Sequence, residues 1–317
     1  MPETPSCGAI EAWARALGDL APTARPLAGG TGRVPWLLGG PGGRFVLHAY
    51  RGESAVERAT LALAAAGAAC RQGLAAPRPV PTDAGGAFWQ EGEGADAAVY
   101  TLSRWLPGRA RRSWLRLGAA DAEALGIALA DLHAALRTLP PDIGGPGPAG
   151  VGIAHHGRPA DQILHGDPSQ GNILWRIGAP DGRVGFIDFE HAHRGFVELD
   201  LGRALVGMAP WAGAGSSDVF AAFLAGYAAR GGRPSGPRLR RGLAVALDEG
   251  EAWLGRATLS DGQRAAARRW LTRARTVRLD ETVLGRGART ARRPGGAVAD
   301  VAEERRAALP FRRGGDD

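Results

Sequence analysis

The spacing of apolar residues changes character partway along the chain. Residues 9–20 carry apolar side chains at helical spacing, which predicts a short amphipathic helix. Short extended segments then alternate with glycine-rich breaks, which predicts an antiparallel meander followed by a helix that Ser54 caps. The predicted strands lie at 25–28, 34–38, 44–50, 78–81, 87–90 and 99–105.

Helical spacing dominates after the Leu106-Pro107-Gly108 segment, so we expect a boundary there between a small sheet-rich lobe and a larger helical lobe. The predicted domains are 1–107, 108–285 and an Arg-rich tail, 286–317, whose composition is typical of disorder. In the second domain the pattern predicts helices at 119–139, 216–230, 236–257 and 260–283, and a hairpin around 163–188.

Composition narrows the class of protein. The chain has 317 residues, of which 44% are apolar, enough for a sizeable core. It has neither an uninterrupted apolar run of membrane-spanning length nor a secretory signal pattern, so we expect a cytoplasmic protein that does not act on membranes. The sequence carries no signal for an oligomeric state.

The net charge of +7 has an uneven origin. All 39 basic residues are arginine, and eight of them lie in 286–317. A nucleic-acid-binding surface would combine a basic stripe with aromatic side chains on a folded element, and the tail offers only Phe311. We therefore do not expect a nucleic-acid partner, and the absence of lysine limits which side chains can bind phosphate.

The residues best suited to catalysis or metal binding lie in two neighbouring stretches of the sequence. Asp167 and Asn172 follow the apolar run at 163–164, and Asp188 follows the apolar run at 184–187. Strand ends at these places would bring three oxygen-bearing side chains together, as Mg²⁺ prefers when phosphates complete its coordination. An aspartate followed five residues later by asparagine is also the layout of a kinase catalytic loop.

His-Gly-Asp at 165–167, Asn172, Ile-Asp-Phe at 187–189 and Asp-Leu at 200–201 resemble the aminoglycoside phosphotransferase and choline kinase family of small-molecule kinases. The resemblance covers about 20–285 and is strongest over 160–205. It implies an α+β, protein-kinase-like two-lobe fold, with an antiparallel sheet and helix in the N-lobe and a mainly helical C-lobe. It further implies ATP and Mg²⁺, with Asp167 as catalytic base, Asn172 and Asp188 as metal ligands, and His165 and Asp200 supporting the loop.

The N-lobe departs from the family pattern at the phosphate-binding lysine. Kinase-like folds place this lysine on the third strand, paired with a helix glutamate. Here His48 occupies the lysine position, Val46 lies on the same strand face to cover the adenine, and Glu57 is the candidate helix partner. The turn that precedes the second strand is another candidate for phosphate binding. It consists of Gly29, Gly30, Thr31, Gly32 and Arg33.

The sequence therefore predicts an ATP- and Mg²⁺-dependent O-phosphotransferase that acts on a hydroxyl group of a small molecule, such as an aminoglycoside or related antibiotic or metabolite. One alternative is a Ser/Thr kinase for a peptide in natural-product biosynthesis, with the Arg-rich surface attracting an acidic segment. The other is a nucleotide-binding pseudokinase scaffold, suggested by the missing lysine.

Overall fold

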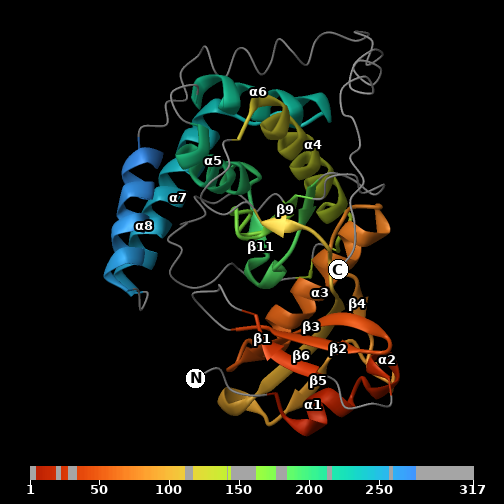
Figure 1. The fold of residues 1–317 in the computed structure, drawn as a ribbon. Helices are drawn as coiled ribbons and strands as arrows, with labels where there is room; N and C mark the ends of the chain where they lie inside the picture. Colours follow the sequence, from red (N-terminus) through yellow and green to blue (C-terminus); the bar gives the residue numbers. More distant parts are fainter. Residues whose placement is uncertain are drawn as a thin grey trace, which may run out of the picture.

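The computed structural model describes residues 5–18, 23–27, 34–110, 117–140, 142–143, 162–175, 184–212, 216–256 and 260–275. The candidate glycine turn at 29–33 and the predicted tail at 286–317 lie outside this part of the chain. The described elements combine an antiparallel sheet with helices, as the predicted α+β class requires (Figure 1).

A six-stranded antiparallel sheet forms the first lobe, in the order β1-β2-β3-β6-β4 with β5 also pairing to β6. Pro26 in β1 lies on an edge strand, where proline is tolerated because no ladder hydrogen bond is lost. The elements are α1 (Cys7–Glu11), α2 (Ala14–Leu17), β1 (Thr23–Pro26), β2 (Trp36–Gly40), β3 (Gly43–Arg51), α3 (Ala55–Arg71), β4 (Pro79–Val80), β5 (Trp89–Glu91), η1 (Gly94–Asp96) and β6 (Ala98–Arg104).

The two faces of β3 serve different purposes. Phe45 and Leu47 are buried against Trp13 and Leu38, which gives the sheet a small core of its own. Val46 and His48 alternate with them and are half-buried, so they lie on the opposite face of the strand. The structure thus places Val46 and His48 on one face, outside the small core.

The helix predicted over 9–20 forms instead as two short helices, so that prediction was wrong in its continuity. The Ser6 hydroxyl accepts a hydrogen bond from the Ala9 main chain at 3.0 Å and starts α1 before the predicted position. Trp13 is fully buried, and its indole Nε1 donates to Val80 O at 2.9 Å. Anchoring this side chain to the sheet separates α1 from α2.

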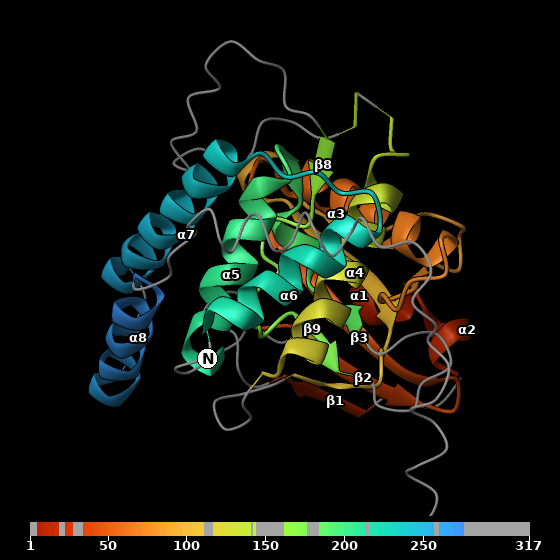
Figure 2. The ribbon, with the colours of Figure 1, turned by 90° about the horizontal axis from the view of Figure 1, so that it is seen from above.

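The second lobe is mainly helical. Its elements are β7 (Arg109–Ala110), α4 (Ala119–Leu136), β8 (Gln162–Leu164), β9 (Ile173–Trp175), β10 (Val184–Phe186), η2 (Phe189–His191), β11 (His193–Gly195), α5 (Glu198–Ala212), α6 (Ser216–Ala229), α7 (Gly236–Arg256) and α8 (Asp261–Ala274). Helices α7 and α8 lie on one flank, with α5 between them and the rest of the lobe (Figures 1 and 2). Among the described helices, none is long and apolar enough to cross a bilayer.

Glycine allows α4 and α6 to pack closely. A Cβ atom on Gly126 of α4 would lie 2.0 Å from Phe223 O, and one on Gly226 of α6 would lie 2.2 Å from Glu123 O. The two backbones therefore meet without intervening side chains at this crossing. Because α4 also packs against β8, this contact supports the strand that leads into the Asp167 loop.

Candidate active site

A hairpin aligns the ends of the two chemically interesting stretches. Strands β9 and β10 pair in antiparallel register, with Ile173 opposite Phe186. The ladder continues one step beyond the strands, because the Ile187 main-chain N–H donates to Asn172 O at 2.9 Å. Asn172 and Asp188 therefore leave neighbouring strands at the same end of the hairpin.

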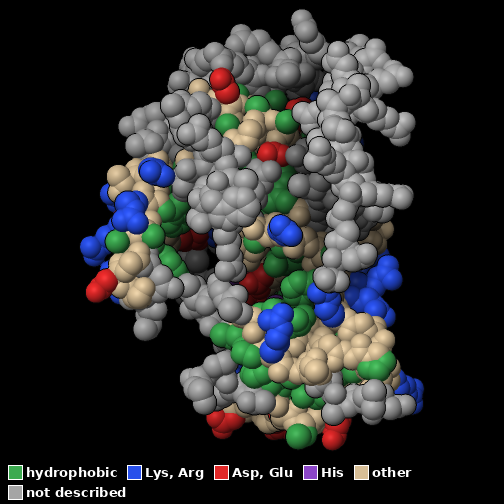
Figure 3. All heavy atoms as spheres, viewed as in Figure 1, with side chains coloured by type: hydrophobic (Ala, Val, Ile, Leu, Met, Phe, Trp, Pro, Cys, Tyr) green, Lys and Arg blue, Asp and Glu red, His purple; other side chains and the backbone are tan. Residues whose placement is uncertain are grey.

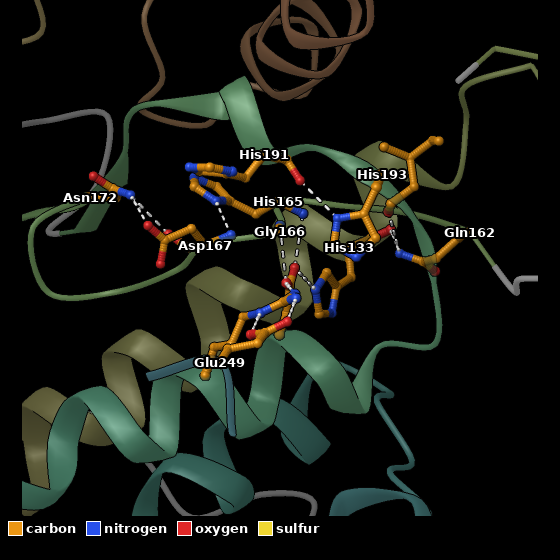
Figure 4. Close-up of polar contacts among 12 residues, drawn as sticks. His133, Gln162, His165, Gly166, Asp167, Asn172, His191, His193 and Glu249 are labelled. Atoms are coloured by element: carbon orange, nitrogen blue, oxygen red, sulfur yellow. Dashed lines mark hydrogen bonds and ion pairs between the residues drawn. The ribbon is translucent and has the colours of Figure 1, made fainter. Parts of the chain in front are cut away.

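Asp167 and Asn172 are joined by two hydrogen bonds (Figure 4). The Asn172 Nδ2 group donates to Asp167 Oδ2 at 2.9 Å and to the Asp167 main-chain oxygen at 3.0 Å. Burial raises the pKa of the Asp167 carboxyl, while the charge of His191 and a hydrogen bond from Ser169 act in the opposite direction. This carboxylate is oriented by the loop and has an increased tendency to accept a proton.

Asp188 adopts a left-handed backbone conformation with φ of 65°, which is uncommon for a residue with a side chain. Burial raises the pKa of its carboxyl, and the charge of His48 is the largest opposing influence. The structure therefore brings Asp188 at the hairpin end and His48 on β3 into the same electrostatic environment. A strained backbone at this position is typical of functional sites.

Asp200, at the start of α5, holds the loop at 165–167 in place, because its side chain binds the main chain of that loop. Its carboxylate accepts hydrogen bonds from His165 N at 2.8 Å and from Gly166 N at 3.1 Å. His133 Nε2 donates to the same carboxylate at 3.2 Å, and Arg203 lies 3.4 Å away. Burial alone would raise the pKa of Asp200, but the hydrogen bond and charge of His133 hold it well below its usual range.

His165 links the two halves of the site as a neutral side chain. Burial lowers its pKa to about 4. The Asp167 main-chain N–H donates to His165 Nδ1 at 3.3 Å, and His165 Nε2 donates to Ile187 O at 3.1 Å. The ring therefore fixes the spacing between the Asp167 loop and the strand that ends at Asp188.

Four further side chains contribute to the site, and they were not identified from the sequence. Arg203 binds Glu249 of α7 through Nε at 2.9 Å and Nη2 at 2.7 Å, so it connects Asp200 to a second helix. The spacing of three between Asp200 and Arg203 on one helix was the available signal for the first contact. His133 Nδ1 lies 2.8 Å from the Tyr227 hydroxyl, a contact between α4 and α6 that sequence spacing does not show.

The N-lobe candidates differ in how near the site they lie. His48 acts on Asp188, whereas Glu57 is exposed in the first turn of α3. Within the described part of the chain, Glu57 has no hydrogen bond or ion pair to His48, so the structure does not bring these two together. Arg44, an arginine on the same strand as His48, lies over the Trp105 ring, with its Cζ atom 5.4 Å from the ring centroid.

The donor chemistry suits a magnesium ion that also binds phosphate. No cluster of three His, Cys, Asp or Glu side chains of the kind that encloses a metal occurs among the described residues. Magnesium in nucleotide sites instead takes one or two protein oxygen ligands and completes its coordination with phosphate and water. Because Asn172 uses its Nδ2 group toward Asp167, its Oδ1 atom and the Asp188 carboxylate remain as a fitting pair.

A sheet lobe, a helical lobe and a His-Gly-Asp loop facing a second aspartate define the class of kinase-like phosphotransferases. The model of the phosphotransferase enzyme family (APH) matches residues 23–151 and 152–243, more than half of the chain. The protein belongs to this family and is a phosphotransferase of the kinase class, with the protein-kinase-like two-lobe fold that the sequence predicts. The inactive-scaffold alternative is therefore set aside.

Solved structures of low sequence identity share the fold. A microcompartment-associated aminopropanol kinase is 16% identical, with a TM-score of 0.63, and the match covers 82% of this chain and 93% of that one. An amicoumacin kinase in complex with AMP-PNP, Ca²⁺ and amicoumacin is 14% identical, with a TM-score of 0.59 and coverage of 79% and 87%. An aminoglycoside phosphotransferase from Alicyclobacillus acidocaldarius is 13% identical, with a TM-score of 0.57 and coverage of 92% and 95%. The comparison with curated proteins finds no match.

Proposed function

We propose that this enzyme transfers the γ-phosphoryl group of ATP to a hydroxyl group of a small molecule, in a reaction that requires Mg²⁺. We assign the nucleotide to the sheet lobe, 1–107, and the acceptor to the helical lobe, 108–285. In this assignment Asp167 orients the acceptor hydroxyl and accepts its proton. Catalysis rests on positioning and charge stabilisation, as is general for phosphoryl transfer.

The arrangement of Asp167 carries the proposal. Its carboxylate is held by Asn172 at 2.9 Å and carries no salt bridge among the described residues, so it is free to accept a proton from a bound hydroxyl. The raised pKa of this carboxyl, caused by burial, improves its match to that task. The hydrogen bonds from His165 N and Gly166 N to Asp200 hold the loop that bears Asp167 in place.

Asn172 and Asp188 are the proposed metal ligands, through Oδ1 and the carboxylate. Bound there, magnesium would neutralise charge on the β- and γ-phosphates. Asn172 also orients Asp167 through its amide nitrogen, so one side chain connects the metal site to the base.

His48 is the proposed substitute for the phosphate-binding lysine, because it occupies the lysine position on β3 and acts on Asp188. Val46, on the same face, is proposed to contact the adenine. Glu57 and the turn at 29–33 stay predictions, the first because it lies exposed and the second because it lies outside the described residues.

The acceptor is proposed to be a small molecule because the solved structures of similar fold include an aminopropanol kinase and an aminoglycoside phosphotransferase. Aminopropanol and an aminoglycoside are therefore the first acceptors to test. The peptide alternative depends on the Arg-rich segment at 286–317, which lies outside the described part of the chain.

The test compares the wild type with Asp167→Asn, using Mg²⁺, ATP and each acceptor, with ADP release as the measure of turnover. We expect Asp167→Asn to lower turnover by about 10²–10⁴-fold, because it removes the base while keeping the hydrogen bond from Asn172. Calorimetry should show nucleotide affinity within a few-fold of the wild type, since Asp167 acts on the acceptor. Asp131→Asn, in an exposed ion pair with Arg230, is the matched control. Undiminished turnover in Asp167→Asn would refute the assignment.

A further inference from the structure

The turn that follows Asp188 carries a histidine to which the proposed function gives no task. His191 ends η2, and its main-chain oxygen accepts a hydrogen bond from His193 Nδ1 at 2.7 Å. The same oxygen packs against Gly166, where a Cβ atom would lie only 1.8 Å from it. The turn that bears His191 therefore rests directly on the loop that bears Asp167.

The His191 side chain is about half exposed, at 51%, although its backbone is fixed. It extends from the turn toward the His165 ring and Asp167 (Figure 4). Its Nε2 atom lies 3.4 Å from Glu190 Oε1, the carboxylate of the preceding residue. A ligand that reached Asp167 would thus meet an accessible imidazole beside it.

The His191 side chain interacts electrostatically with the carboxylates of both Asp167 and Asp188. Among the described side chains, His191 exerts the strongest positive influence on Asp167, and it also acts on Asp188. The hydrogen bond that His191 donates to the Glu190 carboxylate, together with these negative charges, raises the pKa of His191. These influences favour the cationic form of His191 more than in a free imidazole, at a position beside Asp167 (Figure 4).

Arg203 is the side chain whose positive charge has the next largest effect on the pKa of Asp167, but it already binds other carboxylates. Its Nε and Nη2 atoms bind Glu249 at 2.9 and 2.7 Å, its Nη1 atom lies 3.4 Å from Asp200, and its side chain is only 9% exposed. Acidic side chains are recessed in the hollow between the two lobes, and arginine side chains lie both on the outer flank and around the edge of this hollow (Figure 3). The chain has no lysine, so a cation for this position has to come from histidine or arginine.

Phosphoryl transfer places negative charge on the oxygens of the transferred group, and a fixed cationic donor there stabilises the transition state. We propose that His191 donates a hydrogen bond to the γ-phosphoryl group at the junction of Asp167 and Asp188. It thereby supplies, from the helical lobe, a charge that adds to that of His48 on β3. This inference rests on the proposed function, because it needs a nucleoside triphosphate bound at this site.

Two nucleotides that differ at the γ-phosphate provide the test. The affinities of MgADP and of the non-hydrolysable triphosphate MgAMP-PNP are measured by calorimetry for the wild type and for His191→Ala. We expect His191→Ala to weaken AMP-PNP binding by about tenfold, the value of one charge-assisted hydrogen bond. ADP binding should change by less than about twofold, because ADP lacks the group that His191 contacts.

Three further variants separate charge from structure. His191→Gln keeps a donor without the charge and should lose most of the AMP-PNP preference, whereas His191→Arg should restore part of it. Glu190→Gln removes the carboxylate that raises the pKa of His191, so it should lower the preference for AMP-PNP over ADP only in part. If His191→Ala weakens both nucleotides equally and lowers the melting temperature, His191 has only a structural role and the inference is wrong.

The wild type distinguishes this failure from failure of the proposed function. A wild type that binds neither MgADP nor MgAMP-PNP overturns the proposed function, and this inference with it. A wild type that binds both, alongside a His191→Ala variant with an unchanged preference for AMP-PNP, overturns the role of His191 alone.

Discussion

Replacing Asp200 by asparagine should destabilise the protein by a large fraction of its total stability. The carboxylate accepts hydrogen bonds from His165 N, Gly166 N and His133 Nε2 at 2.8 to 3.2 Å, and an arginine lies 3.4 Å away. Asparagine keeps one oxygen but replaces the other with an NH₂ group that would face donors. At least one buried donor loses its partner, and the buried cation of Arg203 loses a counter-charge.

Removing one partner of a buried ion pair costs about 3–5 kcal/mol, so we expect a loss of this size for Asp200→Asn. Domains are commonly stable by about 5–15 kcal/mol, so the change is measurable by urea unfolding. Asp131→Asn provides the matched control, because it breaks a 2.7 Å ion pair whose Arg230 and Asp131 side chains are 55% and 26% exposed. Exposed pairs contribute about 0–1 kcal/mol.

The pH dependence gives the same reasoning a second test. Because the folded protein holds the pKa of Asp200 well below its usual range, this stabilisation is complete above the unfolded value of about 3.9. It is lost only as the pH falls from there through the folded-state pKa. The stability difference between wild type and Asp200→Asn should therefore stay constant from about pH 7 to 5 and shrink at more acid pH. An Asp200→Asn variant no less stable than Asp131→Asn at pH 7 would refute this account.

Substitutions at three other positions test the site. Asp188→Ala should remove the Mg²⁺-dependent part of ATP binding, which a thermal shift with MgATP against ATP plus EDTA measures; an unchanged Mg²⁺ contribution would contradict the ligand role. Gly166→Ala should disorder the catalytic loop and lower both turnover and melting temperature, because φ is 87° and the Cβ atom would meet His191 O at 1.8 Å; wild-type values for both would show that the loop adapts. His48→Ala should weaken MgATP binding measured by calorimetry and His48→Lys should preserve or strengthen it, whereas equal affinities in both would place the phosphate contact elsewhere.

The sequence could predict those parts of the site that depend on residues close together along the chain. The His-Gly-Asp loop and the Asp188 strand lie between short apolar runs, and a hairpin between such runs aligns Asn172 with Ile187 without help from distant elements. The alternation of Phe45 and Leu47 with Val46 and His48 likewise follows from strand geometry alone. The family and its α+β two-lobe fold were implied by the resemblance of the motifs at 165–172 and 187–189 to known phosphotransferases.

The features that the sequence could not predict depend on how helices and strands far apart in the chain pack together. Glu57 has the expected order along the chain, but the rotation of α3 about its axis leaves it exposed, and periodicity does not fix that rotation relative to His48. Arg203 and Glu249 meet across the α5–α7 contact, a pairing of residues 46 positions apart. The interrupted first helix depends on where the Trp13 indole finds an acceptor, Val80 O, on a strand formed much later in the chain.

The support of the catalytic loop by Asp200 has a consequence for hydrogen exchange. The amide protons of His165 and Gly166 are bound to a carboxylate that is itself tied to α4 through His133 and to α7 through Arg203 and Glu249. Active-site loops usually open far more readily than the core, yet these two amides can be released only when the helices holding Asp200 separate. They should exchange with the slow amides of α4 and α5, so that the loop and the helical lobe behave as one cooperative unit. Nucleotide binding to the sheet lobe would then meet a catalytic loop that is already in place.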